Sequence, residues 1–294
     1  MVDHESLAER FEEHRTHLRA VAYRMLGSLG EADDAVQEAW LRLSRSDTAG
    51  VENLAGWLTR VVARVCLDML RSRTSRREEP LVPQLTGPIA NGQDESDPEH
   101  EALLAESVGL ALLVVLDRLA PVERVAFVLH DVFAVPFTEI AAILKRSPTA
   151  TRKLTSRARR RIQGAAPGPD ADVIRHRHVV DAFLAAARGG DTEALLAVLD
   201  PNVVRRADRA VLPAGAATEL RGAEAVAEET RTFSRRARFA QPALVNGTVG
   251  IVVAPRGKLH LALSLTIKDE KIAEIDVIAD PPRLRRLKLA VLVN

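Results

Sequence analysis

The chain has few of the residues that cross-link a protein or anchor it in a membrane. Its single cysteine, Cys66, allows no internal disulfide and no cysteine-rich zinc site. Aromatic residues make up only 3%, so the cores must be packed from Leu, Val, Ile and Ala. The longest apolar stretch, residues 108–116, is far shorter than the roughly 20 residues of a membrane-spanning helix. The start carries Asp3, Glu5 and Glu9, unlike a signal peptide. These absences predict a soluble cytoplasmic protein with no membrane partner.

Two loop-like stretches divide the chain into three blocks. Residues 72–98 are rich in proline, glycine and charge, and residues 164–170 have a similar composition on a smaller scale. The first two blocks have the apolar spacing of helices, whereas residues 249–254, 258–267 and 271–278 alternate like strands. We predict two all-α domains followed by an α+β domain. The predicted boundaries are 1–74, a linker at 75–98, a second domain at 99–164, a linker at 165–172, and a third domain at 173–294.

Acidic residues are absent from residues 145–161, which hold eight basic ones. Residues 138–144 have the apolar stripe of a short helix, and a four-residue break follows. Ser147 is a good N-cap and Pro148 suits a first helical position. The next helix, residues 149–162, keeps its apolar side chains on one side and its basic ones elsewhere. The pattern predicts a helix-turn-helix.

This predicted second helix has the chemistry of a DNA-reading helix. Its basic side chains can neutralise phosphates and release counterions, and arginine can pair with guanine. Residues near the N-terminal end of a recognition helix reach base edges in the major groove. The residues expected to contact DNA are Thr149, Arg152, Lys153, Ser156 and Arg157. A solvated basic helix that ends a bundle is the alternative, and the motif alone does not separate a sigma factor from a repressor or response regulator.

Two predicted helices of the first block also suggest function. Residues 31–43 open with acidic residues, which favour a helix N-terminus; capping and solubility are their simplest explanation. In the helix predicted at residues 53–71, Trp57 lies one turn before Arg60 and two turns before Arg64. An aromatic ring beside arginines can stack an unpaired base, although a core role for Trp57 is the alternative.

Together these segments resemble one family. In the first block they are Ala22-Tyr-Arg-Met-Leu-Gly27, Ala32-Asp-Asp-Ala-Val-Gln-Glu-Ala-Trp-Leu41 and Trp57-Leu-Thr-Arg-Val-Val-Ala-Arg-Val-Cys-Leu-Asp68. In the second they are Leu119-Ala-Pro-Val-Glu-Arg-Val-Ala-Phe-Val-Leu129 and Glu139-Ile-Ala-Ala-Ile-Leu144. Over most of residues 7–163 the chain resembles the extracytoplasmic-function (ECF) sigma factors, small members of the primary sigma superfamily.

The resemblance implies two partners, RNA polymerase core and promoter DNA. The family's acidic helix docks on the clamp helices of the largest polymerase subunit, and its counterparts here are Asp33, Asp34, Gln37 and Glu38. The loop at residues 44–52 would cradle a flipped base of the melted −10 element, and Trp57, Arg60 and Arg64 would hold the non-template strand. The helix-turn-helix would read the −35 element beside the polymerase flap, and the linker would thread towards the RNA exit channel.

Two positions depart from the family pattern. Family members usually have Asn where Val65 stands, which puts the details of base contacts there in doubt. A glycine is common in the turn where Lys145 stands, so this turn is expected to differ slightly.

The third block resembles the SnoaL-like domains, which share the cone-shaped α+β fold of nuclear transport factor 2. The resemblance lies in residues 196–204, residues 221–226 and the strands that follow. Sigma factors of the actinobacterial sigma I and sigma J types have this layout. One branch has an Asp-Gly-Gly-Gly-Lys motif in this domain and a Trp-Leu-Pro-Glu-Pro motif in the linker. Neither motif is intact here: the most similar segments are Arg256-Gly-Lys258 and Glu79-Pro-Leu-Val-Pro83. The chain looks more like the sigma I type.

The third block offers little chemistry for catalysis. Related folds use Asp and His around a pocket, and His260 and Asp276 are the candidates, but an ordinary strand histidine is the better explanation. We expect no catalytic residue, no metal and no cofactor. The preferred role is regulation, with room for a small-molecule ligand. The rivals are a helix-turn-helix regulator that acts without polymerase, and an enzyme or small-molecule sensor in this block.

Two other features are expected to be structural. His130 beside Asp131 fits a helix interior or surface. Cys66 is expected to be a small buried hydrophobe, with a redox sensor as the alternative.

Overall fold

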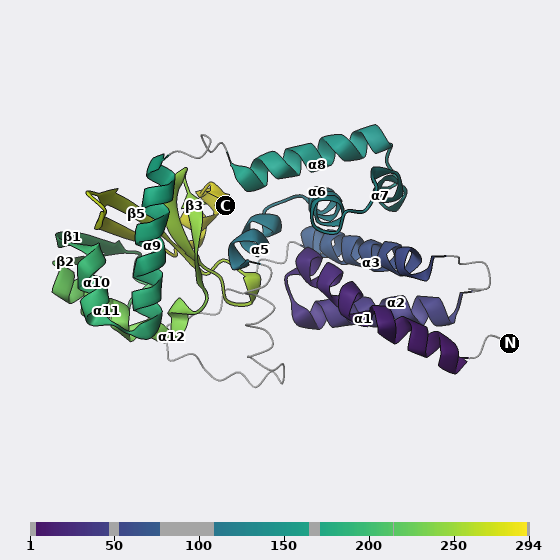
Figure 1. The fold of residues 1–294 in the computed structure, drawn as a ribbon, viewed down its shortest axis with the longest axis horizontal. Helices are drawn as coiled ribbons and strands as arrows, with labels where there is room; N and C mark the ends of the chain where they lie inside the picture. The colour runs from purple at the N-terminus through teal and green to yellow at the C-terminus, as the bar shows by residue number, and fades with distance from the viewer. Residues whose placement is uncertain (1–3, 47–52, 77–108, 165–170, 214, 293–294) are drawn as a thin grey trace. The chain divides into compact units, whose positions relative to one another are not determined.

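The computed structural model describes residues 4–46, 53–76, 109–164, 171–213 and 215–292 (Figure 1). The chain forms two compact units, one of residues 1–81 and 116–160 and one of residues 82–115 and 161–294. No helix in the described ranges is long and apolar enough to cross a membrane. Most of the predicted linker at 75–98, most of the one at 165–172, and the larger part of the loop at 44–52 lie outside the described residues.

The first unit begins with three packed helices, α1 (His4–Leu26), α2 (Leu29–Ser44) and α3 (Leu54–Arg76). The side chain of Asn53 accepts a hydrogen bond from the Gly56 N–H at 2.8 Å and so caps α3. The apolar residues spaced for a helix in α1 are buried, as the sequence predicted: Leu18, Val21, Ala22 and Met25.

The rest of the first unit is also helical. It contains α6 (Pro121–Phe127), the π-helical turn η1 (Val128–Val132), α7 (Phe137–Leu144) and most of α8 (Pro148–Gln163). Within this unit α3 packs against α6 and α7, and α1 packs against η1.

Buried polar groups lie where α3 meets α6. Arg124 of α6 is 3% exposed, and its Nη1 donates to Asp117 Oδ1 at 3.0 Å. Cys66 of α3 is fully buried, and burial raises its pKa to about 12 although the positive charge of Arg124 opposes this shift. A thiol this far from ionising at neutral pH is unreactive, so the prediction of a buried small hydrophobe is confirmed.

The second unit is built on a seven-stranded sheet in the order β2-β1-β6-β5-β4-β3-β7. Only β1 and β6 run parallel; the other described pairs are antiparallel. The strands are β1 (Leu199–Ala207), β2 (Glu219–Arg221), β3 (Ala240–Val245), β4 (Thr248–Val253), β5 (Leu261–Lys268), β6 (Lys271–Ile278) and β7 (Leu289–Ala290).

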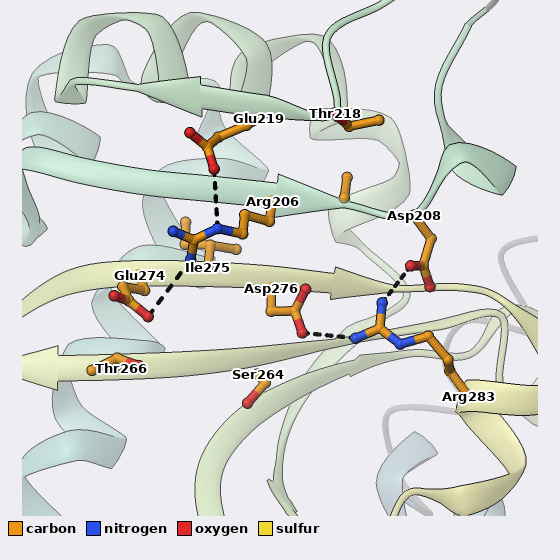
Figure 2. A pocket seen from close by; sticks show the side chains of 11 residues that line it. Arg206, Asp208, Thr218, Glu219, Ser264, Thr266, Glu274, Ile275, Asp276 and Arg283 are labelled. Atoms are coloured by element: carbon orange, nitrogen blue, oxygen red, sulfur yellow. Dashed lines mark hydrogen bonds and ion pairs between the residues drawn. The ribbon is translucent and has the colours of Figure 1, made fainter.

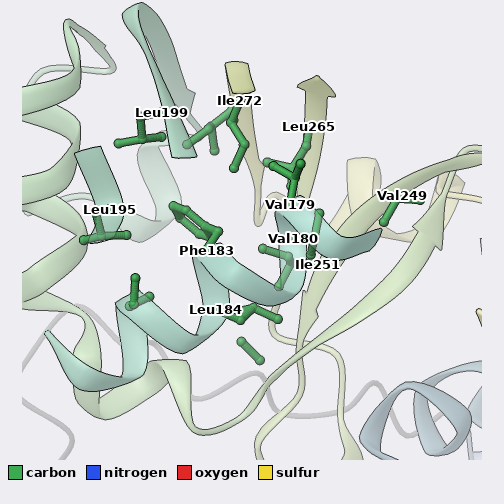
Figure 3. Close-up of a cluster of buried hydrophobic side chains, with 14 of the residues drawn as sticks. Val179, Val180, Phe183, Leu184, Leu195, Leu199, Val249, Ile251, Leu265 and Ile272 are labelled. Carbon is green, nitrogen blue, oxygen red and sulfur yellow. The ribbon is translucent and has the colours of Figure 1, made fainter. Parts of the chain in front are cut away.

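One face of this sheet is covered by helices, chiefly α9 (Ala171–Gly189), with α10 (Thr192–Val198) and α11 (Ala223–Thr232) beside it (Figure 1). Side chains of α9 and of the strands fill the space between them (Figure 3). The largest contributors include Val180, Phe183, Leu184, Ile251, Leu265 and Ile272. The fold class is therefore as predicted: two helical domains followed by an α+β domain.

Two strand boundaries differ from the prediction. The strand expected at residues 258–267 begins at Leu261, because the 3-10 turn Pro255–Gly257 occupies the chain just before it. The strand expected at 249–254 is Thr248–Val253, whereas 271–278 is correct. His260 therefore precedes β5 rather than lying within it.

The second unit also holds the two ends of the helix-turn-helix block. The helix α5 (Leu110–Asp117) begins here, and the Ala111 N–H donates to Gln241 Oε1 on β3 at 3.2 Å. At the other end, the Val291 N–H donates to the carbonyl of Ile162 in the last turn of α8 at 2.8 Å. Backbone groups that a helix end leaves without a partner are thus satisfied by the C-terminal domain.

Candidate nucleic-acid interface

The helix-turn-helix forms as predicted from α7, a three-residue break and α8. Ser147 Oγ accepts from the Ala150 N–H at 3.2 Å, and Pro148 is the first helical residue. Lys145 ends α7 in the left-handed conformation, with φ 54° and ψ 49°. Glycine adopts this conformation without strain, which gives a physical reason for the glycine that is common in the family.

The sequence of α8 divides it into a buried and an exposed face. The buried side includes Thr151, Thr155, Ala158 and Ile162. The five residues expected to contact DNA are all exposed, and their spacing of three and four places them on one face: Thr149, Arg152, Lys153, Ser156 and Arg157.

The exposed face of α8 is strongly positive. The helix carries no acidic residue. Arg159 forms an ion pair with Asp131 of η1, whereas within the described parts of the chain no ion pair reaches Lys153, Arg157 or Arg160. These cations are therefore available to a polyanion.

A set of contacts that the sequence does not predict surrounds the start of α7. The His130 ring stacks on the Phe137 ring with 3.8 Å between centroids, and the Arg152 guanidinium carbon lies 5.4 Å from the same Phe137 centroid. His130 and Asp131, expected in a helix interior or on a helix surface, lie in a π-helical turn, where they contact α7 and α8. Sequence patterns carry no signal for such a turn.

Trp57, Arg60 and Arg64 lie on one side of α3, as their spacing requires. Trp57 is half-buried and both arginines are exposed. The Arg60 Nε donates to the Gly56 carbonyl at 3.3 Å, and Arg64 Nη2 donates to the Ala142 carbonyl of α7 at 3.3 Å. In the free chain Arg64 thus contacts the helix-turn-helix.

The acidic residues of α2 also lie on one face. Asp33, Asp34 and Gln37 are exposed and Glu38 is partly so. Asp33 pairs with Arg19 at 2.7 Å and Glu38 with Arg42 at 3.0 Å. Because about half of the surface of both carboxylate side chains stays exposed, these pairs leave the acidic face open to a partner.

In the C-terminal domain, a cavity of about 640 Å³ lies over strands β1, β2, β5 and β6 (Figure 2). Its two arginines are neutralised by carboxylates. Arg206 pairs with Glu219 at 3.1 Å and Glu274 at 3.9 Å. Arg283 pairs with Asp208 and, at 3.0 Å, with Asp276.

Asp208, one of the acidic groups of this cavity, is held in its charged form. Burial acts to raise the pKa of Asp208, but the backbone N–H groups of Asp280 and Ala279 and the Arg283 guanidinium hold this pKa below its ordinary value. The sheet register sets Asp276 opposite Ser264, four residues beyond His260. His260 does not line the cavity, so the structure does not assemble the two as an acid–base pair there.

Comparison with known proteins identifies the two helical domains. Residues 10–76 match the Sigma-70 region 2 family, and residues 109–162 match the Sigma-70, region 4 family. The chain is 38% identical to the ECF RNA polymerase sigma factor SigJ of Mycobacterium tuberculosis, over 93% of this chain and 91% of that protein. It is 34% identical to the probable ECF RNA polymerase sigma factor SigI of the same species, over 98% of both.

A solved structure is also similar. The crystal structure of the M. tuberculosis extracytoplasmic function sigma factor SigJ matches 95% of this chain and 98% of that chain, with 33% identity and a TM-score of 0.45. Full-length sequence relatives and both sigma regions in the expected order decide the family. The chain belongs to the ECF RNA polymerase sigma factors and is an alternative sigma factor that directs transcription initiation.

Proposed function

We propose that three helical faces divide the work of this sigma factor. The acidic face of α2 docks on the clamp helices of the polymerase, α3 holds the non-template strand of the −10 element, and α8 reads the −35 element. The observation that carries the proposal is the exposed face of α8, where five residues suited to DNA contact lie together without an acidic neighbour on the helix.

The proposed docking face on α2 combines charge with exposure. Asp33, Asp34, Gln37 and Glu38 project from a helix whose opposite side is buried in the three-helix core. A folded helix that presents carboxylates in fixed positions suits a basic partner surface, and such complementarity steers association as well as register.

The proposed −10 site on α3 places a half-buried ring beside two guanidinium groups. Trp57 supplies a face on which an unpaired base stacks, and Arg60 and Arg64 supply charge for the backbone. Arg64 exchanges its bond to Ala142 for a phosphate when promoter DNA binds, so promoter binding loosens one contact between α3 and α7.

A charge reversal tests the docking face. Replacing Asp34 and Glu38 by Lys should lower affinity for purified core polymerase at least tenfold, while circular dichroism shows an unchanged fold. The matched control is Glu9→Lys with Glu13→Lys, because both are exposed on α1 with the same i,i+4 spacing and the same change in charge. Unchanged core binding in the α2 variant would contradict the docking assignment.

The rival role, a DNA-binding regulator that acts alone, has a separate test. Purified protein is mixed with core polymerase and assayed for promoter-specific transcription, and it is titrated alone against duplex DNA. Transcription that depends on both proteins supports the sigma mechanism proposed for this chain. Tight duplex binding by the protein alone, with no core complex, favours the rival.

We further propose that the C-terminal domain regulates the sigma domains and acts in the cytoplasm with the polymerase. Support comes from its contacts to both ends of region 4, through Gln241 at α5 and Val291 at α8. Val291→Pro removes the N–H that bonds to Ile162, and Val291→Ala keeps it. We expect promoter-specific transcription to change in the Pro variant and not in the Ala variant; equal transcription would contradict this route of regulation.

The same domain is proposed to have no catalytic role. Buried apolar side chains pack between its helices and its sheet, so we place a small-molecule ligand in the polar cavity over β1 and β6, where Arg206 and Arg283 already hold carboxylates. Deleting everything after residue 170 should change transcription without abolishing core binding. Turnover of a substrate by residues 171–294 would overturn the proposal.

A further inference from the structure

The π-helical turn η1 carries two side chains that the proposed DNA site does not use, His130 and Asp131. Both face the helix-turn-helix. The turn η1 follows α6 directly and precedes the loop to α7, so these side chains lie beside the helix-turn-helix. Their contacts with α7 and α8 therefore bear on how the recognition helix is held.

The first contact runs through Phe137, the first residue of α7. The Phe137 ring stacks on His130 at 3.8 Å between centroids, with 30° between the ring planes. The Arg152 guanidinium lies 5.4 Å from the Phe137 centroid, within the range of a cation–π interaction. Arg152 is exposed, so this ring restricts the direction of a side chain that would otherwise sample many rotamers.

The second contact joins Asp131 to Arg159. Both Nε and Nη2 of Arg159 donate to Asp131 Oδ1, the Nε at 3.1 Å. The Asp131 side chain is only 18% exposed. Arg152 and Arg159 are seven residues apart, which places them on the same side of α8 two turns from one another. A rotation of α8 about its axis would therefore disturb both contacts.

We infer that Phe137 and Asp131 are positioning residues for −35 recognition, because they fix the rotation of α8 and aim the Arg152 guanidinium. The inference rests on the proposed role of α8. The fold of the helix-turn-helix does not depend on these contacts, since α8 is anchored by its buried side, including Thr151, Thr155 and Ala158. Removing either contact thus alters base discrimination more than it alters folding.

The experiment uses the full chain assembled with core polymerase. A promoter is first selected from random duplex DNA with the wild-type holoenzyme, and binding is then measured to every single-base change in its −35 element. Arg152→Ala identifies the positions that Arg152 reads. At those positions Phe137→Leu should lower discrimination about two- to five-fold, the range expected for one exposed cation–π contact. Asp131→Asn should lower it at the same positions.

Two variants serve as controls. Phe137→Tyr keeps the aromatic ring and should retain wild-type discrimination. Phe133→Leu removes another half-buried phenylalanine, whose ring contacts His17 and Arg24 rather than α8, and should leave −35 discrimination unchanged. Combining Phe137→Leu with Arg152→Ala should lose no more discrimination than Arg152→Ala alone, because the ring acts through the arginine.

The outcomes separate the inference from the proposed function. The −35 profile is the set of affinities for every single-base change in the −35 element. If Arg152→Ala leaves this profile unchanged at every position, the assignment of Arg152 as a base-reading residue fails. If Arg152→Ala changes the profile while Phe137→Leu and Asp131→Asn leave it as in the wild type, the positioning inference is overturned. Should the Leu variant fail to fold, Phe137→Met fills similar space without a ring and must show the same loss of discrimination.

Discussion

Arginines occur in two regions of this protein with opposite surroundings. On α8 the helix has no carboxylate of its own, and Lys153, Arg157 and Arg160 have no ion pair within the described part of the chain. On and around the C-terminal sheet, Arg205 pairs with Glu229, and the other paired arginines there include Arg206, Arg221 and Arg283. Some cations of α8 thus have no ion pair within the described residues, whereas these arginines of the C-terminal domain are neutralised.

The difference teaches why total charge says little about binding. The whole chain has a net charge of only +1, yet α8 presents a positive face to solvent. A cation without a partner can release counterions from a phosphate backbone, whereas a paired one must first give up its carboxylate. The first region is therefore the better suited to a polyanion, and in the second region the buried Arg205 depends on Glu229 for its counter-charge.

The largest expected effect comes from Glu229. It accepts from Arg205 Nε at 2.7 Å, and Arg205 is 3% exposed. Glu229→Ala leaves a buried cation without its counter-charge, and because Glu229 is 26% exposed we expect a loss of about 3 kcal/mol in the free energy of unfolding of the C-terminal unit, the low end for a buried pair. The loss in the free energy of unfolding is measured by urea unfolding, with amide hydrogen exchange in β1 as the probe.

Two variants sharpen this first comparison. Glu229→Ala combined with Arg205→Met removes both charges and should recover much of the loss. Arg160→Ala on α8 should change stability by less than about 0.5 kcal/mol, because it is an exposed surface position. A similar loss in Arg160→Ala and Glu229→Ala would contradict the contrast between paired and unpaired cations.

A smaller effect is expected for DNA binding by α8. Replacing Lys153 and Arg157 by Gln should cost about 1.5 kcal/mol of binding free energy, and it should lower the slope of log K against log salt by about 0.9 for each phosphate that the variant no longer neutralises. Titrations of promoter DNA with holoenzyme at several salt concentrations give both values.

The matched control for that measurement lies on the sheet. Arg206→Gln with Arg221→Gln removes the same charge from arginines that both pair with Glu219. Affinity and salt slope should stay at the wild-type values. An equal fall in both double variants would show that net charge, rather than its placement, governs binding.

Much of the fold could be predicted because it depends on local patterns. Apolar spacing located the helices, and the Ser147 cap and Pro148 marked the start of α8 where the structure has it. The strand at 271–278 was predicted at its observed bounds, whereas β5 was predicted three residues too early. The alternation of residues 258–260 continues the strand pattern, but the turn Pro255–Gly257 lies directly before them, and of these residues His260 donates its N–H to the Val253 carbonyl of β4 at 2.9 Å.

The candidate site was predictable as a set of faces but not as a set of contacts. Helical spacing and their place near the start of a recognition helix predicted that Arg152 and Lys153 contact DNA, and the family resemblance added that this DNA is the −35 element. The Arg64 bond to Ala142 and the Asp131 pair with Arg159 join residues 78 and 28 positions apart. Such contacts depend on how the helices pack, which no local pattern contains.

The smallest expected effect belongs to Lys145, the cation that ends α7. Its φ of 54° is a left-handed conformation that costs a non-glycine residue about 1–2 kcal/mol. Glycine avoids this strain but loses more conformational entropy on folding, which offsets part of the gain. Lys145→Gly should therefore raise the free energy of unfolding by about 0.5 kcal/mol, measured by thermal unfolding of the sigma domains. Lys145→Ala keeps the Cβ and the strain, so it should give no gain. If Lys145→Gly and Lys145→Ala raise the free energy of unfolding equally, the gain comes from removing a positive charge from the basic segment. The left-handed backbone at Lys145 would then not be the source of the strain.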